Sequence, residues 1–240
     1  MAYENGEWIM HGVEDDDPKR LKCASDLIAF INETGFLPLF KNEIEGFSVE
    51  EMTSSRYWWS GDEDNDPWEW RKEAAASGTV AYGKFFDKRA GFVSKEWFPH
   101  FANYRRDGYD FDSRWDDEKT TLRCKKIMDV FERRDELFSY ELKREAGFGK
   151  NGEKNFDGTL TDLMMQTYLI AHDFRQKINR SGSPYGWHVA VYSKPETVWG
   201  AELVTSCYKY KPQESKSAVY EHINSLYTNA SYAQIDRMLK

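Results

Sequence analysis

The sequence predicts an α+β fold, mostly helical, with β-hairpins and a winged-helix architecture. Apolar residues recur at helical spacing in several segments, and two polar turns each separate a pair of strand-like runs. One stretch also has the order helix, short helix, helix, hairpin. The chain has 240 residues, 40% hydrophobic and 16% aromatic, which is enough to bury one compact core or two small ones.

Charge and composition suggest four parts. Residues 1–70 hold 5 Lys and Arg against 17 Asp and Glu, a balance of -12, so the other 170 residues carry +4 of the net -8. We expect a polar N-terminal tail over residues 1–22 and an acidic, aromatic-rich α+β domain with a hairpin over 23–116. We then expect a winged-helix domain over residues 117–200 and a helical C-terminal segment over 201–240.

Several classes of protein are excluded by what the sequence lacks. No apolar run approaches the roughly 20 residues that cross a bilayer, and the N-terminus does not resemble a secretory signal. We therefore expect a cytoplasmic protein that does not contact membranes. Three widely spaced cysteines indicate free thiols. The five histidines have no metal-ligand spacing with one another or with the cysteines, so no metal site and no cofactor are expected.

Local signals place the elements of the acidic domain. Apolar residues predict a helix from about residue 25 to 34, ended by Gly35. Asp66 as N-cap and Pro67 at the first position predict a second helix to about residue 77. The same proline argues against a calcium loop over residues 62–73, because a sharp glycine turn is needed at that position. Residues 79–94 read as a β-hairpin around a polar DKRAG turn.

Four of the nine tryptophans fall within thirteen residues of this domain. They could line a pocket that stacks a flat ligand or an extruded base, but we favour the interpretation that they form the core beneath the hairpin. The residues of this candidate pocket are Trp58, Trp59, Trp68, Trp70, Arg71, Tyr82 and Lys84.

The second domain supplies the winged-helix pattern. Helices are predicted over residues 117–133, 140–146 and 159–171, and a hairpin wing over 174–192. In a winged helix the third helix can enter the major groove while the wing brings cations to phosphates. Residues 119–180 hold 13 basic against 10 acidic side chains. The glycines of GFGKNG at 147–152 have dinucleotide spacing but follow a helix, which favours an inter-helix loop.

Four segments then carry a family resemblance. They are DPWEWR at residues 66–71, AYGKFFDKRAGFVSKEWFPHF at 81–101, RRDGYDFD at 105–112 and YGWHVAVYSKPE at 185–196. By these segments the chain resembles the AlkZ-related proteins, relatives of the AlkZ-type winged-helix DNA glycosylases, over most of its length. The resemblance to those glycosylases implies tandem winged helices that bind damaged duplex DNA and cleave the N-glycosidic bond.

The catalytic residues of those glycosylases are not evident in this chain. They use a Gln-x-Gln or Gln-x-Asp motif, and of the four glutamines only Gln234, with Asp236, has that spacing. Gln234 lies six residues from the end of the chain, within a predicted helix. The glycosylase hairpin also has a His-Glu pair where this chain has Lys88 and Arg89. We therefore expect the usual catalytic motif to be missing and assign no catalytic residue.

The leading hypothesis is a winged-helix DNA-binding protein related to DNA-repair glycosylases, with duplex DNA as partner. Its expected DNA contacts are Lys88, Arg89, Arg175, Lys177 and Arg180. One alternative is a DNA glycosylase with an unconventional active site at the tryptophans. Another is a noncatalytic module whose acidic N-terminal half binds a protein partner that the sequence does not identify.

Overall fold

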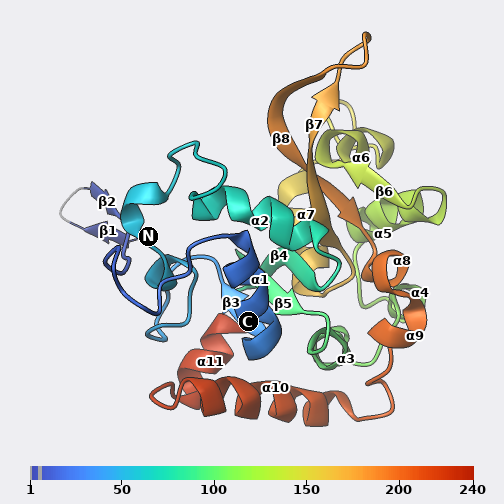
Figure 1. Cartoon of the computed structure of the whole chain (residues 1–240). Helices are drawn as coiled ribbons and strands as arrows, with labels where there is room; N and C mark the ends of the chain where they lie inside the picture. The colour runs from blue at the N-terminus through green and yellow to red at the C-terminus, as the bar shows by residue number, and fades with distance from the viewer. Residues whose placement is uncertain (1, 5–6) are drawn as a thin grey trace.

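A six-stranded antiparallel sheet runs through the computed structural model, which describes residues 2–4 and 7–240 (Figure 1). The chain is 44% helical and 18% strand, so the predicted mixture of helices and hairpins is confirmed. The strand order is β3-β5-β4-β7-β8-β6. These strands are β3 (Phe36–Pro38), β4 (Val80–Phe86), β5 (Arg89–Ser94), β6 (Glu136–Phe138), β7 (Ile170–Ile178) and β8 (Pro184–Ser193).

The sheet consists of two three-stranded halves. They meet where β4 pairs with β7, through Tyr82 and Ala171. In the first half, β3 and β4 both pair with β5, and in the second half β6 and β7 both pair with β8. Each half therefore places a short early strand against the last strand of a hairpin. The two halves have the same strand order and the same antiparallel pairing.

The helices follow the same plan in each half of the chain. A helix precedes the short strand, helical turns follow it, and a further helix leads into the hairpin. In the first half these are α1 (Ala24–Thr34), the 3-10 turns η1 (Glu50–Met52) and η2 (Ser55–Tyr57), and α2 (Pro67–Ala76). In the second half they are α5 (Leu122–Met128) with the 3-10 turn η3 (Asp129–Glu132), α6 (Ser139–Glu145) and α7 (Phe156–Met165).

Two hydrophobic clusters form the core. The first contains the buried residues of α1, α2 and the first half-sheet, and the second contains those of residues 111–169. Helices α3 (Phe98–Arg106) and α4 (Phe111–Asp116) connect the two halves. The C-terminal helices α8 (Pro195–Trp199), α9 (Ala201–Val204), α10 (Pro212–Leu226) and α11 (Tyr232–Met238) follow the second hairpin. Buried residues of α9, α10 and α11 join the first cluster, so the chain returns to the core from which it started.

Several local predictions are confirmed. Helix α1 ends before Gly35, whose φ of 81° lies in the left-handed region that glycine adopts most easily. Helix α2 starts at Pro67, and the Asp66 carboxylate accepts a hydrogen bond of 2.9 Å from the Trp68 backbone amide. Strands β4 and β5 form the predicted hairpin, and the glycines at 147–152 lie between α6 and α7.

Two helix predictions were wrong in extent. The helix expected over residues 117–133 begins only at Leu122, because the Thr121 hydroxyl caps it by accepting a hydrogen bond from the Cys124 amide. The helix expected over residues 159–171 ends at Met165. Thr167 has a φ of 62°, which ends the helical turn, and the apolar residues after it enter β7. A short buried apolar run has the same appearance in a helix and in a strand.

The N-terminal segment and the cysteines complete the description. Within the predicted tail over residues 1–22, β1 (Ala2–Glu4) and β2 (Glu7–Ile9) form a two-stranded sheet, while residues 1, 5 and 6 lie outside the described residues. The three cysteines are free, as predicted. Among the described residues, none of the helices combines the length and the apolar character needed to cross a membrane.

Candidate nucleic-acid interface

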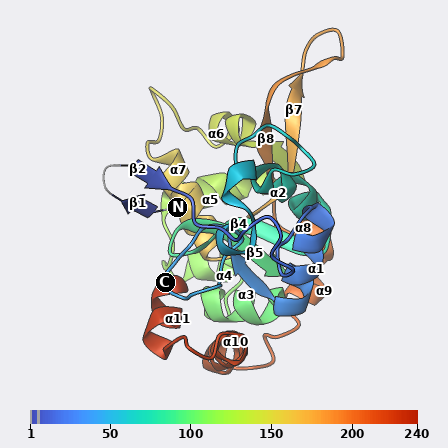
Figure 2. The same ribbon diagram turned by 60° about the vertical axis from the view of Figure 1, so that its left-hand side comes forward.

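The β7–β8 hairpin is the most prominent feature of the surface. Its outer part extends well beyond the rest of the molecule in Figure 1 and in the turned view of Figure 2. The strands pair from Ile170 with Ser193 to Ile178 with Pro184, with two shifts of register on the way. At the tip, the Asn179 side chain accepts hydrogen bonds from the backbone amides of Ser181 and Ser183, at 3.0 and 2.9 Å. The turn is thus held by its own side chain.

The base of this hairpin is anchored to α2 and β4. The Arg71 guanidinium lies 3.6 Å from the centroid of the Trp68 ring and 4.8 Å from that of Phe174. Phe174 in turn packs against Tyr82, with ring centroids 5.5 Å apart. Burial lowers the pKa of Arg71 and raises the pKa of Tyr82 to about 12. These contacts fix the direction in which the hairpin leaves the sheet.

The outer half of the hairpin has a different character, because its side chains have little tertiary packing. Trp187 is 91% exposed, Ile178 is 61% exposed and Tyr185 is 50% exposed. Lys177 and Arg180 supply positive charge beside them, and the Lys177 ammonium lies 4.7 Å from the centroid of the Tyr140 ring on α6. We call this set the hairpin tip surface: Lys177, Ile178, Arg180, Tyr185 and Trp187.

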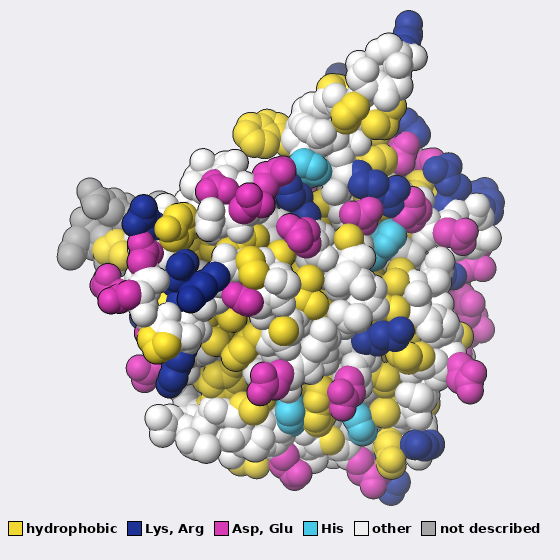
Figure 3. Space-filling view, in the orientation of Figure 1, with side chains coloured by type: hydrophobic (Ala, Val, Ile, Leu, Met, Phe, Trp, Pro, Cys, Tyr) yellow, Lys and Arg dark blue, Asp and Glu magenta, His cyan; other side chains and the backbone are white. Residues whose placement is uncertain are grey.

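Helix α6 extends the positive charge next to this surface. Its Lys143 and Arg144 are exposed, and Tyr140 is 38% exposed with its ring stacked on Phe138. Figure 3 shows Lys and Arg side chains over α6 and at the end of the hairpin, whereas Asp and Glu gather over the loop before α2. The -8 of the whole chain is thus spread unevenly over the surface.

The structure separates the five cations predicted to contact DNA. Arg175 lies at the hairpin base, where it forms ion pairs with Glu136 and Asp173. The hydrogen bond from Arg175 lowers the pKa of Glu136, so both groups remain charged and neutralise each other. Lys177 and Arg180 belong to the hairpin tip surface, and the side chain of Arg180 is exposed.

Lys88 and Arg89 occupy the other hairpin, at the turn between β4 and β5. Both are exposed, and Lys88 has a φ of 62° in that turn. Lys84 and Lys88 line a groove shared with the acidic residues Asp157 and Asp162 of α7. Those carboxylates are the exposed charges of α7, whose other face is buried in the second cluster. The helix predicted to enter the major groove thus presents negative charge to solvent.

The candidate tryptophan pocket divides into core and surface residues. Trp58 and Trp70 are buried, and their indole N–H groups donate to Thr53 Oγ1 and to the Asp64 carbonyl. Trp59 is 48% exposed, and its ring centroid lies 6.4 Å from that of Trp68. A flat ligand approaching this cluster would therefore meet Trp59 and the edge of the Trp68–Arg71 stack.

The pair that matches the Gln-x-Asp spacing is occupied by structural contacts. Gln234 caps the start of α11, because its side-chain oxygen accepts hydrogen bonds from the backbone amide and the hydroxyl of Ser231. Its side-chain amide donates to the Glu43 carbonyl. The Asp236 carboxylate accepts a hydrogen bond of 2.7 Å from the Tyr220 hydroxyl. Both side chains hold α11 against its neighbours.

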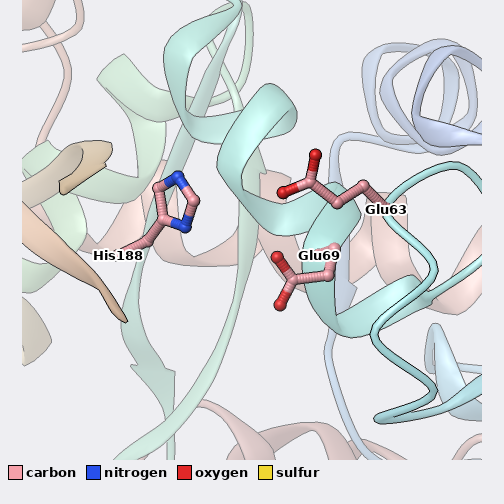
Figure 4. Close-up of side chains that lie close together, drawn as sticks. All are labelled: Glu63, Glu69 and His188. Carbon is pink, nitrogen blue, oxygen red and sulfur yellow. The ribbon is translucent and has the colours of Figure 1, made fainter. Parts of the chain in front are cut away.

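Sequence reasoning missed one group of side chains. Glu63, in the loop before α2, and Glu69, in the first turn of α2, lie close to His188 of β8 (Figure 4). The Lys72 ammonium also contacts both carboxylates, at 3.0 Å from Glu63. More than one hundred residues separate His188 from the two glutamates, so no spacing rule could have connected them.

Comparison with known proteins places the chain in a family. A profile of the AlkZ-related family matches residues 21–240. The chain belongs to the AlkZ-related family. The match covers both half-sheets, both clusters and the β7–β8 hairpin, so the family resemblance seen in the sequence is confirmed. No curated protein and no solved structure matches the chain.

Proposed function

We propose that the chain is a DNA-binding protein made of two winged-helix units, which contacts duplex DNA with the β7–β8 hairpin. Membership of a family named for its relation to AlkZ supports an association with DNA. The repeated order of helix, short strand, helical turns, helix and hairpin supports the two units. In this proposal residues 24–94 form the first unit and residues 122–193 the second, and each hairpin is a wing.

The observation that carries the proposal is the chemistry of the hairpin tip surface. Trp187 is 91% exposed and lies on the same projecting hairpin as the exposed Ile178 and Tyr185, and grouped exposed apolar side chains mark interaction sites. Lys177 and Arg180 beside them complement phosphates, and an apolar side chain can insert between the base steps of a duplex. The wing thus combines exposed cations with exposed apolar side chains, on a protein whose net charge is negative.

The proposed interface differs from the sequence hypothesis in one respect. Helix α7 exposes Asp157 and Asp162, which would repel phosphates in a major groove. We therefore assign the contact to the wing and to the exposed cations of α6, and Arg175 to a positioning role at the hairpin base. Lys88 and Arg89, on the wing of the first unit, remain candidate phosphate contacts.

Fluorescence anisotropy with a labelled duplex of about two helical turns tests this proposal. The dissociation constant should rise steeply with salt, because counterions are released as phosphates are neutralised. The variant K177E/R180E should bind more weakly, with a salt slope lower by about 1 for each lost phosphate contact. The matched control is K209E/K211E, which makes the same charge change at exposed lysines near the start of α10, far from the hairpin (Figure 1).

Two results would reject the proposal. Affinity that does not depend on salt would remove the phosphate contacts, and equal weakening by the two double variants would show that only net charge matters. If no duplex binds while a protein is retained through the acidic N-terminal half, the alternative of a protein-interaction module is favoured.

A glycosylase activity is the second candidate, and one observation favours it. Trp59 is exposed beside Trp68 and Arg71, where an extruded base could stack. An abasic-site cleavage assay on alkylated duplexes tests it. We expect no product above the protein-free reaction, because the Gln234–Asp236 pair is engaged in structural contacts. Product that disappears in W59A would establish the activity.

A further inference from the structure

Three side chains with metal-binding donors converge on the α2 side of the hairpin (Figure 4). One donor atom from each of Glu63, Glu69 and His188 lies within 4.8 Å of the other two. They come from a loop, a helix and a strand, so the tertiary structure brings them together. The Glu63 side chain is 72% exposed, whereas that of Glu69 is 22% exposed, which leaves one side of the cluster open to water.

The imidazole distinguishes this cluster from a patch of surface acids. Within the described residues, neither nitrogen of His188 forms a hydrogen bond with the protein, and its ring faces the two carboxylates in Figure 4. A neutral imidazole offers a lone pair that Mg²⁺ and Ca²⁺ seldom use, because these ions prefer oxygen. One nitrogen and two carboxylates suit a divalent transition ion such as Zn²⁺.

The carboxylates of Glu63 and Glu69 are already paired with a positive side chain. The Lys72 ammonium lies 3.0 Å from Glu63 and forms a second ion pair with Glu69. An entering ion must displace this ammonium, whose side chain is 15% exposed. Lys72 therefore competes with any other cation for these two carboxylates.

We propose that Glu63, Glu69 and His188 bind one Zn²⁺ ion, with water in the open position, and that the ion fixes β8 to α2. The bound ion would hold the base of the β7–β8 hairpin, in addition to the contact of Arg71 with Phe174. This proposal does not depend on DNA binding, because its measurements contain the protein and the metal alone.

The test is a titration of the full chain, stripped with EDTA, with Zn²⁺ in competition with a chromophoric chelator. We expect one equivalent to bind and to raise the Tm, since binding to the native state alone stabilises it. H188N and E63Q should each weaken binding by roughly tenfold or more, as losses around a metal site commonly do. K72M should bind Zn²⁺ more tightly than the unmodified chain, because it removes the competing ammonium.

Matched variants exclude other sites. H172N removes another half-buried histidine, on β7, and C23S removes the half-buried thiol that could bind Zn²⁺ elsewhere, so both should retain full affinity. Far-UV circular dichroism without metal verifies that each variant is folded. E63Q should retain the fold because the Glu63 side chain is exposed.

Three outcomes would overturn the proposal. They are the absence of a one-to-one complex, Zn²⁺ binding that survives both H188N and E63Q, and equal affinity for Mg²⁺, which would contradict the role of the imidazole. The first two would assign the cluster to an ion pair that joins α2 to its preceding loop. A K72M variant that binds Zn²⁺ no more tightly than the unmodified chain would overturn the role of Lys72 as a competitor for the carboxylates.

Discussion

The two halves of the β7–β8 hairpin use the same strands for different purposes. At the base, the Arg71 guanidinium contacts two rings, and Arg175 is neutralised by Glu136 and Asp173. In the outer half, Trp187, Tyr185 and Arg180 are exposed. A charge or ring that is already paired gives little to a ligand, whereas an exposed one gains contacts on binding. The base therefore determines where the hairpin points, and the outer half determines what it can bind.

The largest expected contrast is between two isoleucines of β7. Ile170 is fully buried, so I170A should lower the free energy of unfolding by about 2 to 5 kcal/mol. Ile178, on the same strand, is 61% exposed, and I178A should change the free energy of unfolding by at most about 0.5 kcal/mol. Urea unfolding followed by circular dichroism measures both. If I178A were as destabilising as I170A, the outer half would have to pack against the protein.

A second prediction concerns the exposed tryptophan. W187A should weaken duplex binding by about 1 kcal/mol or more, the loss typical of an aromatic residue that anchors an interface. The free energy of unfolding of W187A should equal that of the unmodified chain, because the Trp187 side chain is 91% exposed. The comparison is W59A, at the other exposed tryptophan, measured by the same anisotropy assay. A loss of affinity confined to W59A would move the interface to the tryptophan cluster.

The smallest expected effect concerns Arg175 and pH. The hydrogen bond from Arg175 depresses the pKa of Glu136 below its ordinary value of 4.5, so the resulting stability is present above that pH and is lost as the pH falls below it. R175M should therefore lose less stability than the unmodified chain between pH 5 and about pH 3. Both groups are partly exposed, so the difference should be under about 1 kcal/mol.

Thermal unfolding across this pH range measures the difference. R180M, which removes an exposed cation at the tip, serves as the control and should follow the unmodified chain. If R175M and the unmodified chain lost the same stability on acidification, the ion pair with Glu136 would contribute nothing to the hairpin base.

Predictions from sequence succeeded where the interacting groups are neighbours in the chain. The start of α2 follows from Asp66 and Pro67, and the end of α1 from Gly35, because a cap involves only a few adjacent residues. The turn between β4 and β5 was found from its polar residues. The end of α7 was missed because apolar spacing continued past Thr167 into a buried strand. The start of α5 was missed because the cap at Thr121 was not recognised.

The candidate site was only partly predictable. Lys177 and Arg180 were found because they are cations near a turn, but the sequence could not show that Arg175 has carboxylate partners. Trp187 was missed because its exposure depends on how far the hairpin extends beyond the core. Glu63, Glu69 and His188 left no signal, since they approach one another only after the β7–β8 hairpin packs against α2.

The amino-acid sequence by itself determined the family, the helices that begin at local caps, the two hairpins and the uneven distribution of charge. Only the tertiary structure decided that β6 pairs with β8, that α10 and α11 return to the first cluster, and which cations remain unpaired. The physical reason is range. Capping and turn formation act over a few residues, whereas burial and ion pairing depend on atoms that folding alone brings together.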